Sequence, residues 1–499
     1  MEYKRPVQTS PKVKPRLIIH GGAGNIKPSN LTPERYNAVR QSLLEMVAKT
    51  HTYMFAPKAS SSGALPTALE VATYAVTLLE NDPLFNAGKG AVFTRDGIQQ
   101  LEASVMVSRG YAKRATGVLG LQHVKNPILL AKAVLEHGEE DLWGKKGQGH
   151  KDNVGGDDTD STRTEVRGGV DCSDPIRVDA PSAQGHTLLF GASAESLARK
   201  YGLQLMPTEY FFTQQRWDEH IRSLERERAG CQTQYLASWS ALDYLPQGTT
   251  GAVALDGEGV VCCATSTGGL TNKLTGRIGD TPVPGAGYWA EEWKDNVPLD
   301  SAVHPSSFWD RADEVVRRPG SALEFVGALR GLMADCLPTP FLYAPVPKHS
   351  FSSQLITTRS FATSGTGNGD SFLRVNAART AAAIARWKGV SSAEALTAVT
   401  GPNGELQKSA GDRWMVTGEG EGGMIGIESV IVSDAEGNIA DHRSDIIQDH
   451  NCPGMFRAWV DDDDKAVFQV WHDSAEVDGH GFLGEGRRED IRKCEKLVL

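Results

Sequence analysis

Long apolar runs are missing from this sequence of 499 residues. A membrane-spanning helix needs about 18 or more largely uninterrupted apolar residues, and no such window occurs. Residues 1–17 also lack the apolar core of a secretory signal peptide, and they contain several Lys and Arg residues instead. We therefore expect a cytoplasmic protein with no membrane partner.

Paired cysteines and basic clusters are also missing. The seven cysteines form no C-x-x-C pair and have no paired histidines near them, so the sequence indicates neither a disulfide framework nor a zinc site. The formal net charge is −10, and no Lys/Arg cluster offers the basic face that nucleic acids or anionic membranes select. These absences favour a small-molecule substrate and exclude nucleic acid as a partner.

The composition is that of a folded protein, with 40% hydrophobic and 23% charged residues. Length alone does not settle the number of domains. From about 138 to 185 the chain is rich in Gly, Asp, Lys, Ser and Thr, which predicts a flexible linker. A stretch rich in Pro, Trp and Ser, about 293–353, is interpreted as an insertion.

Periodicity predicts several elements. Residues 17–19 indicate a buried strand that ends in a glycine-rich turn, and apolar positions between 65 and 79 follow the period of a helix. Residues 250–256 and 259–265 favour a hairpin, and 377–387 a helix. Because strands and helices do not alternate regularly, we expect two stacked sheets flanked by helices.

The glycine-rich segments 21–24, 268–269 and 365–369 do not match a phosphate-binding loop or a complete dinucleotide fingerprint. A stronger pattern is Gly-Thr-Thr-Gly-Ala-Val-Ala-Leu-Asp at 248–256. It is followed by Ala-Thr-Ser-Thr-Gly-Gly at 264–269 and Gly-Arg-Ile-Gly-Asp-Thr-Pro at 276–282.

These motifs resemble the plant-type asparaginase and isoaspartyl peptidase family, whose superfamily includes glycosylasparaginase and taspase. Residues 20–24, 84–93, 366–370 and 454–456 support the resemblance. It implies an α+β fold, namely a four-layer αββα sandwich of the N-terminal nucleophile hydrolase type, here with a long flexible linker and insertions.

By this resemblance the chain cuts itself between Gly248 and Thr249. Residues 1–248 would form an alpha subunit that includes the linker, and 249–499 a beta subunit that includes the insertion, within one globular unit. The chemistry is intelligible, because a threonine hydroxyl needs a base beside it and an N-terminal amine with a pKa of about 7.7 to 8.0 supplies one. Gly248 can adopt the strained backbone that the cleavage requires.

The resemblance assigns further roles. Thr267 would tune the nucleophile Thr249 through a hydrogen bond, whereas read by itself it is an ordinary strand end. Arg277 would bind the α-carboxylate of the substrate and Asp280 its α-ammonium. A guanidinium can bind a carboxylate through two parallel hydrogen bonds, and a carboxylate accepts from an ammonium. The alternative for this pair is a surface ion pair near a turn.

Thr366 and Gly367 match the oxyanion hole of the family, and the same pattern also occurs in ordinary glycine turns. Asn86 is expected near the active site. The loop around it resembles the segment whose backbone carbonyls bind a structural sodium ion, although a plain loop is equally consistent. Those loop residues are Leu79, Glu80, Asp82, Phe85, Ala87 and Lys89.

The expected activity is hydrolysis of the side-chain amide of L-asparagine or of β-aspartyl peptides, with no cofactor and no catalytic metal. The resemblance also implies a homodimer of cleaved protomers that acts on an amino acid or a dipeptide. Two enzymatic alternatives stay open, a glycosylasparaginase-like activity and a taspase-like threonine endopeptidase. The non-enzymatic alternative is an uncleaved binding protein of the same fold.

Overall fold

The computed structural model describes residues 12–58, 64–109, 114–143, 182–229, 248–295, 355–472, 482 and 485–494. The chain divides into two compact units. The larger one comprises 1–293, 359–430 and 442–499, and it holds every predicted site residue. The smaller one comprises 294–358 and 431–441, and its described part includes the turn between the strands at 422–433 and 439–450.

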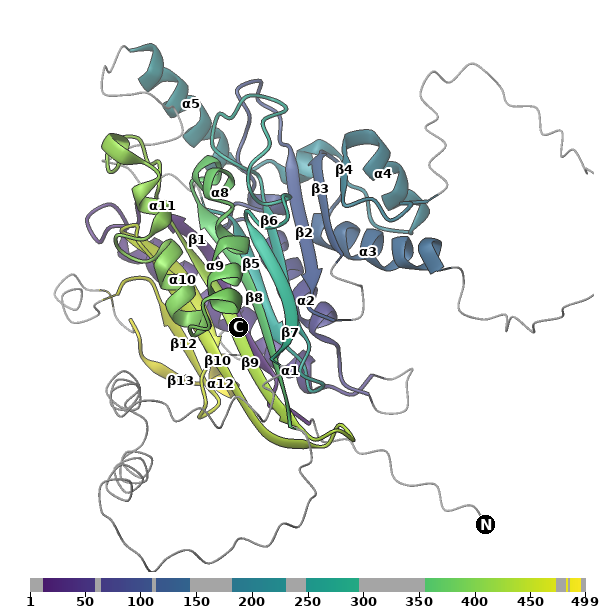
Figure 1. Ribbon diagram of the computed structural model, residues 1–499. Coiled ribbons are helices and arrows are strands. Elements are labelled where there is room, and N and C mark those ends of the chain that lie inside the picture. Colours follow the sequence, from purple (N-terminus) through teal and green to yellow (C-terminus); the bar gives the residue numbers. More distant parts are fainter. Residues whose placement is uncertain are drawn as a thin grey trace, which may run out of the picture. The chain divides into compact units, whose positions relative to one another are not determined.

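A nine-stranded sheet forms the centre of the larger unit (Figure 1). In spatial order its strands are β13 (Arg488–Asp490), β12 (Lys465–Gln469), β11 (Gly454–Val460), β1 (Arg16–Gly24), β5 (Thr250–Leu255), β6 (Val261–Thr267), β2 (Leu101–Val107), β3 (Ala115–Leu121) and β4 (Leu188–Phe190). The pair β3 and β4 is parallel, whereas β1, β5, β6 and β2 pair antiparallel. The predicted strand at 17–19 and the predicted hairpin are therefore confirmed.

A second sheet has four strands in the order β10 (Ile439–His450), β9 (Gly422–Ser433), β8 (Ile356–Gly367) and β7 (Tyr288–Asp295). Polar contacts connect the two sheets, because Ser364 in β8 lies 2.8 Å from the His20 ring in β1 and 3.0 Å from the Thr265 hydroxyl in β6. The fold is thus a mixed arrangement of helices and sheets, in agreement with the predicted α+β class.

Helices that pack against the nine-stranded sheet include α1 (Pro33–Phe55), α2 (Ala68–Asn81) and α3 (Pro127–Trp143). The helix predicted between 65 and 79 is α2, which begins after Thr67 because that residue caps it in a capping box with Glu70. Helix α3 extends to Trp143, beyond the start of the predicted linker. The remainder of that linker to 181, and the predicted insertion from 296 on, lie outside the described residues.

A second apolar core joins helices α9 (Ala377–Trp387) and α10 (Ser392–Thr400) to side chains of the four-stranded sheet such as Phe361 and Met424. The other helices are α4 (Gly191–Lys200), α5 (Gln214–Arg228), α8 (Gly369–Val375), α11 (Glu405–Lys408) and α12 (Ile491–Cys494), with short 3-10 turns at Gly88–Gly90, Thr208–Phe211 and Gly411–Arg413. Within the described ranges, no helix is both long and apolar enough to cross a membrane.

Residues 91–93, at the end of the segment 84–93, lie in no strand. The Val92 N–H donates to the Asn86 side chain at 3.1 Å, so it is not available to pair with a neighbouring strand.

Candidate active site

Thr249 lies immediately before β5, in the middle of the nine-stranded sheet, and only 4% of it is exposed. Its hydroxyl oxygen lies 3.2 Å from that of Thr281. Thr250 pairs with Ser266 across the hairpin, and this register places Thr249 and Thr267 next to each other at the same end of β5 and β6. Three buried threonines are therefore grouped at this end of the sheet.

Gly248 packs directly against the backbone of β1. A Cβ atom on Gly248 would overlap the Cα of Gly22 and lie 2.5 Å from the Ala23 nitrogen. Only a residue without a side chain fits this approach. The bond before Thr249 is thus held between the start of β5 and the end of β1.

The turn after Thr267 is fixed by Asn86. The Gly269 N–H donates to the Thr267 hydroxyl at 3.0 Å, and the Asn86 amide donates to the Gly269 carbonyl at 2.7 Å. The Gly268 N–H returns a hydrogen bond to the Asn86 carbonyl at 3.1 Å. Asn86 therefore positions the turn beside Thr267.

Thr366 and Gly367 end strand β8 and lie against β1. The Ala23 N–H donates to the Thr366 hydroxyl oxygen at 3.1 Å, which leaves the hydroxyl hydrogen available for donation. Gly367 has a φ of 147°, and a Cβ there would lie 2.5 Å from the Gly422 Cα. Since both Thr366 and Gly248 contact the Gly22–Ala23 backbone, the two motifs meet at the end of β1.

Asp280 is a buried carboxylate, 4% exposed, and its Oδ2 has no hydrogen-bond partner among the described residues. Burial raises the pKa of Asp280 to about 7; the charge of Arg277 opposes this increase, and those of Glu102 and Asp370 add to it. An unpartnered buried acceptor of this kind is suited to bind a cationic group.

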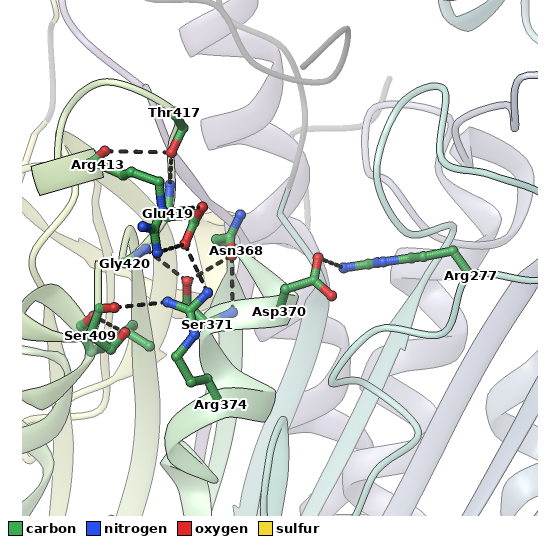
Figure 2. A network of polar contacts seen from close by, with 11 residues as sticks. Arg277, Asn368, Asp370, Ser371, Arg374, Ser409, Arg413, Thr417, Glu419 and Gly420 are labelled. Carbon is green, nitrogen blue, oxygen red and sulfur yellow. Dashed lines mark hydrogen bonds and ion pairs between the residues drawn. The ribbon is translucent and has the colours of Figure 1, made fainter. Parts of the chain in front are cut away.

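Arg277 lies beside Asp280 and forms an ion pair with Asp370, at 2.9 Å (Figure 2). The Asp370 side chain is 57% exposed, so the pair is worth about 0 to 1 kcal/mol and can exchange for another carboxylate. Arg277 therefore pairs with Asp370, whereas the predicted alternative was a surface ion pair of Arg277 with Asp280, and Asp280 is buried.

A polar network holds the helix that carries Asp370. Asn368 caps α8 by accepting from the N–H and the hydroxyl of Ser371, which itself accepts from the Gly420 N–H at 2.8 Å (Figure 2). Glu419 accepts from Arg374 and Arg413. This network fixes the segment that follows Thr366 and Gly367.

His20 is the buried imidazole of the site. It lies 2.8 Å from the Ser364 hydroxyl, and burial lowers the pKa of His20 to about 3, although a hydrogen bond with the Thr249 backbone opposes part of this decrease. The ring is therefore neutral at physiological pH. A free amine with a pKa near 7.7 to 8.0 would be a much stronger base than this imidazole.

The loop predicted to bind sodium contains Gly88 and Gly90, which pack closely against backbone carbonyl groups. A Cβ on Gly88 would overlap the Glu80 carbonyl oxygen, and one on Gly90 would overlap that of Phe85 and lie 2.6 Å from that of Pro83. The Phe85 and Pro83 carbonyl oxygens thus lie close together beside Gly90, and oxygen ligands are those that hard cations prefer. This lining is compatible with a sodium ion.

Asp449, His450 and His472 form a separate cluster of possible metal ligands, whose ligand atoms lie within 4.8 Å of one another. Arg457 donates to His450 Nδ1 at 3.0 Å, so the ring proton lies on Nε2. His472 Nε2 contacts the His450 carbonyl at 2.8 Å, and the two rings stack with centroids 3.9 Å apart. A guanidinium and a protonated Nε2 do not suit metal binding.

Sequence reasoning missed several residues of the site. Thr281 follows Asp280 directly in the motif, but its type gave no sign that it would face Thr249. Ser364 precedes the glycine turn at 365–369, and its contacts to His20 and Thr265 depend on the packing of the two sheets. The grouped threonines, together with a buried carboxylate oxygen that has no partner among the described residues, make this end of the sheet a candidate active site.

Known proteins define the class further. The asparaginase family profile matches residues 13–151 and 169–296. An isoaspartyl peptidase of Salmonella typhimurium is 34% identical over 275 residues, which cover 55% of this chain and 69% of that protein. A plant-type L-asparaginase of Pyrococcus furiosus is 32% identical over 283 residues, or 55% and 70% of the two chains. An isoaspartyl peptidase/L-asparaginase of Mus musculus is 30% identical over 286 residues, or 57% and 67%.

The chain belongs to the asparaginase family, and it is a hydrolase. The matched segments contain Asn86, Thr249, Thr267, Arg277 and Asp280. Thr366 and Gly367 lie beyond them, so their assignment depends on the geometry at the end of β1.

Proposed function

We propose that this chain cuts itself before Thr249 and then hydrolyses the side-chain amide of L-asparagine and of β-aspartyl peptides. The observation that carries the proposal is the buried Thr249 hydroxyl, which lies 3.2 Å from the Thr281 hydroxyl and adjacent to Thr267. Asp280 precedes Thr281 in the chain, and its Oδ2 has no partner among the described residues. The relatives named isoaspartyl peptidase and plant-type L-asparaginase support the substrate class.

The first reaction converts the chain into two subunits. The Thr249 hydroxyl oxygen adds to the Gly248 carbonyl carbon, the peptide bond breaks, and the acyl group moves from nitrogen to oxygen. Water then hydrolyses the resulting ester, which restores the hydroxyl and leaves Thr249 with a free α-amine. The subunits would be 1–248 and 249–499. The tight approach of Gly248 to Gly22 supports this step, because it constrains the scissile bond.

Turnover uses the new amine as the base. It accepts the Thr249 hydroxyl proton while the oxygen attacks the substrate's side-chain carbonyl. The Thr366 hydroxyl and the Gly367 N–H stabilise the negative oxygen that forms. The leaving amine departs as ammonia or as a peptide amine after it receives the proton, and water hydrolyses the acyl ester to release aspartate. His20 is too weak a base for this step, and it contributes by fixing the Thr249 backbone.

The substrate's head group would bind at Arg277 and Asp280. Its α-carboxylate replaces Asp370 on Arg277, and its α-ammonium binds the unpartnered Oδ2 of Asp280. The exposed Asp370 can leave at small cost, and the buried carboxylate gains a partner. This arrangement favours a free amino-acid head over the interior of a polypeptide.

We also propose the four-layer αββα arrangement. The contacts of Ser364 with His20 and Thr265 support two stacked sheets, and the separate apolar cores beneath α1–α3 and beneath α9–α10 support a helical layer on each outer side. A homodimer of cleaved protomers remains a proposal that rests on the family.

We also propose a bound sodium ion and a cytoplasmic location. The loop 79–89 would hold a sodium ion through its carbonyl oxygens, which would fix Asn86 and thereby the turn after Thr267 without taking part in the chemistry. No other cofactor is required. A cytoplasmic location is supported by the four described cysteines, which are all free and buried.

The test compares free substrates with blocked ones. L-asparagine and a β-aspartyl dipeptide should be hydrolysed, whereas the same compounds N-acetylated or amidated at the α-carboxyl should react about ten- to a hundredfold more slowly, since each loses a charge-assisted hydrogen bond. Arg277→Lys should lose much of the rate, because an ammonium cannot form the two parallel bonds. Equal kcat/KM for free and blocked substrates would reject the head-group site and favour a taspase-like endopeptidase.

A further inference from the structure

One face of β2 holds the segment that carries Arg277, Asp280 and Thr281. The side chain of Gln100, just before β2, accepts a hydrogen bond from the Gly276 N–H at 2.8 Å. Two positions further along the strand, Glu102 accepts one from Lys273 Nζ at 3.0 Å. After another two residues, the Ser104 hydroxyl donates to the Thr281 carbonyl at 2.6 Å. Alternate residues of a strand point to the same side, so Gln100, Glu102 and Ser104 lie in a row on one face of β2 and all contact the segment 273–281.

The middle contact is a buried ion pair. The side chains of Lys273 and Glu102 are 1% and 2% exposed, and Lys273 Nζ also donates to the Gln100 carbonyl at 3.2 Å. The second carboxylate oxygen of Glu102 has no hydrogen-bond partner within the described chain. Removing two charges from water is costly, and such pairs often contribute little to net stability. A purely structural role therefore does not account for it.

The position of Glu102 connects it to the active site. It lies directly opposite Thr267 in the pairing of β2 with β6. It also interacts electrostatically with Asp280: the charges of Glu102 and Asp370 raise the pKa of Asp280, and that of Arg277 lowers it. Lys273 pairs with Glu102 and Arg277 pairs with Asp370, whereas the Oδ2 of Asp280 has no hydrogen-bond partner among the described residues.

We propose that the Glu102–Lys273 pair is a positioning pair for the substrate's α-ammonium: it anchors the segment of Arg277 and Asp280 to β2, and Glu102 supplies a fixed negative charge beside Asp280. This inference rests on the proposed function. Glu102 touches no reacting atom, and it acts through Asp280. Its charge makes the head-group site more attractive to a cation and makes Asp280 easier to protonate.

The test separates the charge of Glu102 from its shape. Glu102→Gln keeps the shape and an acceptor for Lys273 but removes the negative charge, so Asp280 should ionise at lower pH. The acid limb of kcat/KM should move down by about one pH unit, the order of effect of one nearby charge at an effective dielectric constant of about 20. Glu102→Asp keeps the charge, and its acid limb should stay near that of the wild type.

The matched control is Glu428→Gln. Glu428 is also a buried acid in an ion pair, with Arg359 at 2.5 Å, and it is not part of the site. Its substitution should leave the acid limb unchanged. An acid limb in Glu102→Gln equal to those of wild type and control would overturn the proposal. If Glu102→Gln fails to fold, Lys273→Met is measured in its place. Its acid limb of kcat/KM should move to higher pH, and an acid limb equal to that of the wild type would contradict the role of the pair.

A readout without turnover distinguishes this inference from the proposed function. Carboxyl carbon NMR of Asp280 in the uncleavable Thr249→Ala background reports its ionisation directly. Asp280 should titrate near pH 7 in that background and about one unit lower when Glu102→Gln is added. A wild type that does not hydrolyse β-aspartyl compounds would refute the proposed function, whereas an unchanged Asp280 titration would refute the role of the pair.

Discussion

The hydroxyl oxygens of Thr249 and Thr281 lie 3.2 Å apart in the buried end of the nine-stranded sheet. Thr281 follows Asp280, so the same short segment contacts both the nucleophile and the head-group site. A shift of this segment would therefore disturb both the attack and the recognition of substrate.

The first prediction removes only this contact. Thr281→Val preserves the volume but loses the hydroxyl, and kcat/KM should fall about two- to tenfold, the effect of one neutral hydrogen bond of about 0.5 to 1.5 kcal/mol. Steady-state kinetics measures it. Thr271→Val is the matched control, because Thr271 is equally buried and its hydroxyl has no partner in the described structure. Equal activity of the two variants would show that Thr281 does not assist Thr249.

The second prediction concerns the approach of Gly248 to β1. In Gly248→Ala the new methyl group would collide with the backbone of Gly22, so the scissile bond should be displaced and self-cleavage should slow by more than tenfold. Intact-mass measurement over time follows the uncut chain. Cleavage at the wild-type rate would mean that this close approach does not position the bond.

The third prediction is a pH dependence. Burial raises the pKa of Asp280 to about 7, and only the ionised form binds an ammonium, so kcat/KM should fall about tenfold per pH unit below pH 7. The effect of Asp280 on the stability of the fold has the opposite pH dependence, because the protonated form is the one that burial favours. The folded pKa lies above the ordinary value of 3.8, so this contribution to stability is complete only below pH 3.8 and is lost as the pH rises from there to about 7.

Asp280→Asn tests the stability part. The variant should be more stable than the wild type at pH 8, by an amount on the order of a few kcal/mol, and this advantage should shrink toward pH 5. Urea denaturation of both proteins at the two pH values measures it. An advantage that does not change with pH would show that Asp280 does not titrate in this range.

The fourth prediction concerns metal removal. Chelation of divalent metals with EDTA should leave turnover intact, because the proposed chemistry uses a threonine and an amine and no metal-bound water. Activity before and after dialysis against EDTA is the measurement. Loss of turnover that zinc restores would require a catalytic metal and would reassign the reaction.

The sequence predicted the local elements well where periodicity or turn residues were strong. Strand β1, the β5–β6 hairpin and helix α9 appear where the pattern placed them. Helix α5 was missed, since it is polar along most of its length and is held by contacts to distant loops, such as that of Arg216 with the Gly90 carbonyl at 2.8 Å. Strands β12 and β13 were missed because they lie in a highly charged segment.

For the site, a linear motif can indicate residue types and spacing but not the contacts between segments. The placement of Thr366 against Ala23, and of Ser364 between His20 and Thr265, depends on how the two sheets meet. Likewise, nothing in the sequence around Glu102 indicated a buried pair with Lys273. These relationships need the fold.

The most direct test of the account is N-terminal sequencing of the purified protein, because fragments of similar size can migrate together on a gel. The account predicts two sequences, that of the original N-terminus and a second one that begins Thr-Thr-Gly-Ala-Val at Thr249. The Thr249→Ala variant should give only the original N-terminus and show no turnover. A homogeneous, uncut wild-type chain that hydrolyses β-aspartyl compounds at full rate would contradict the mechanism.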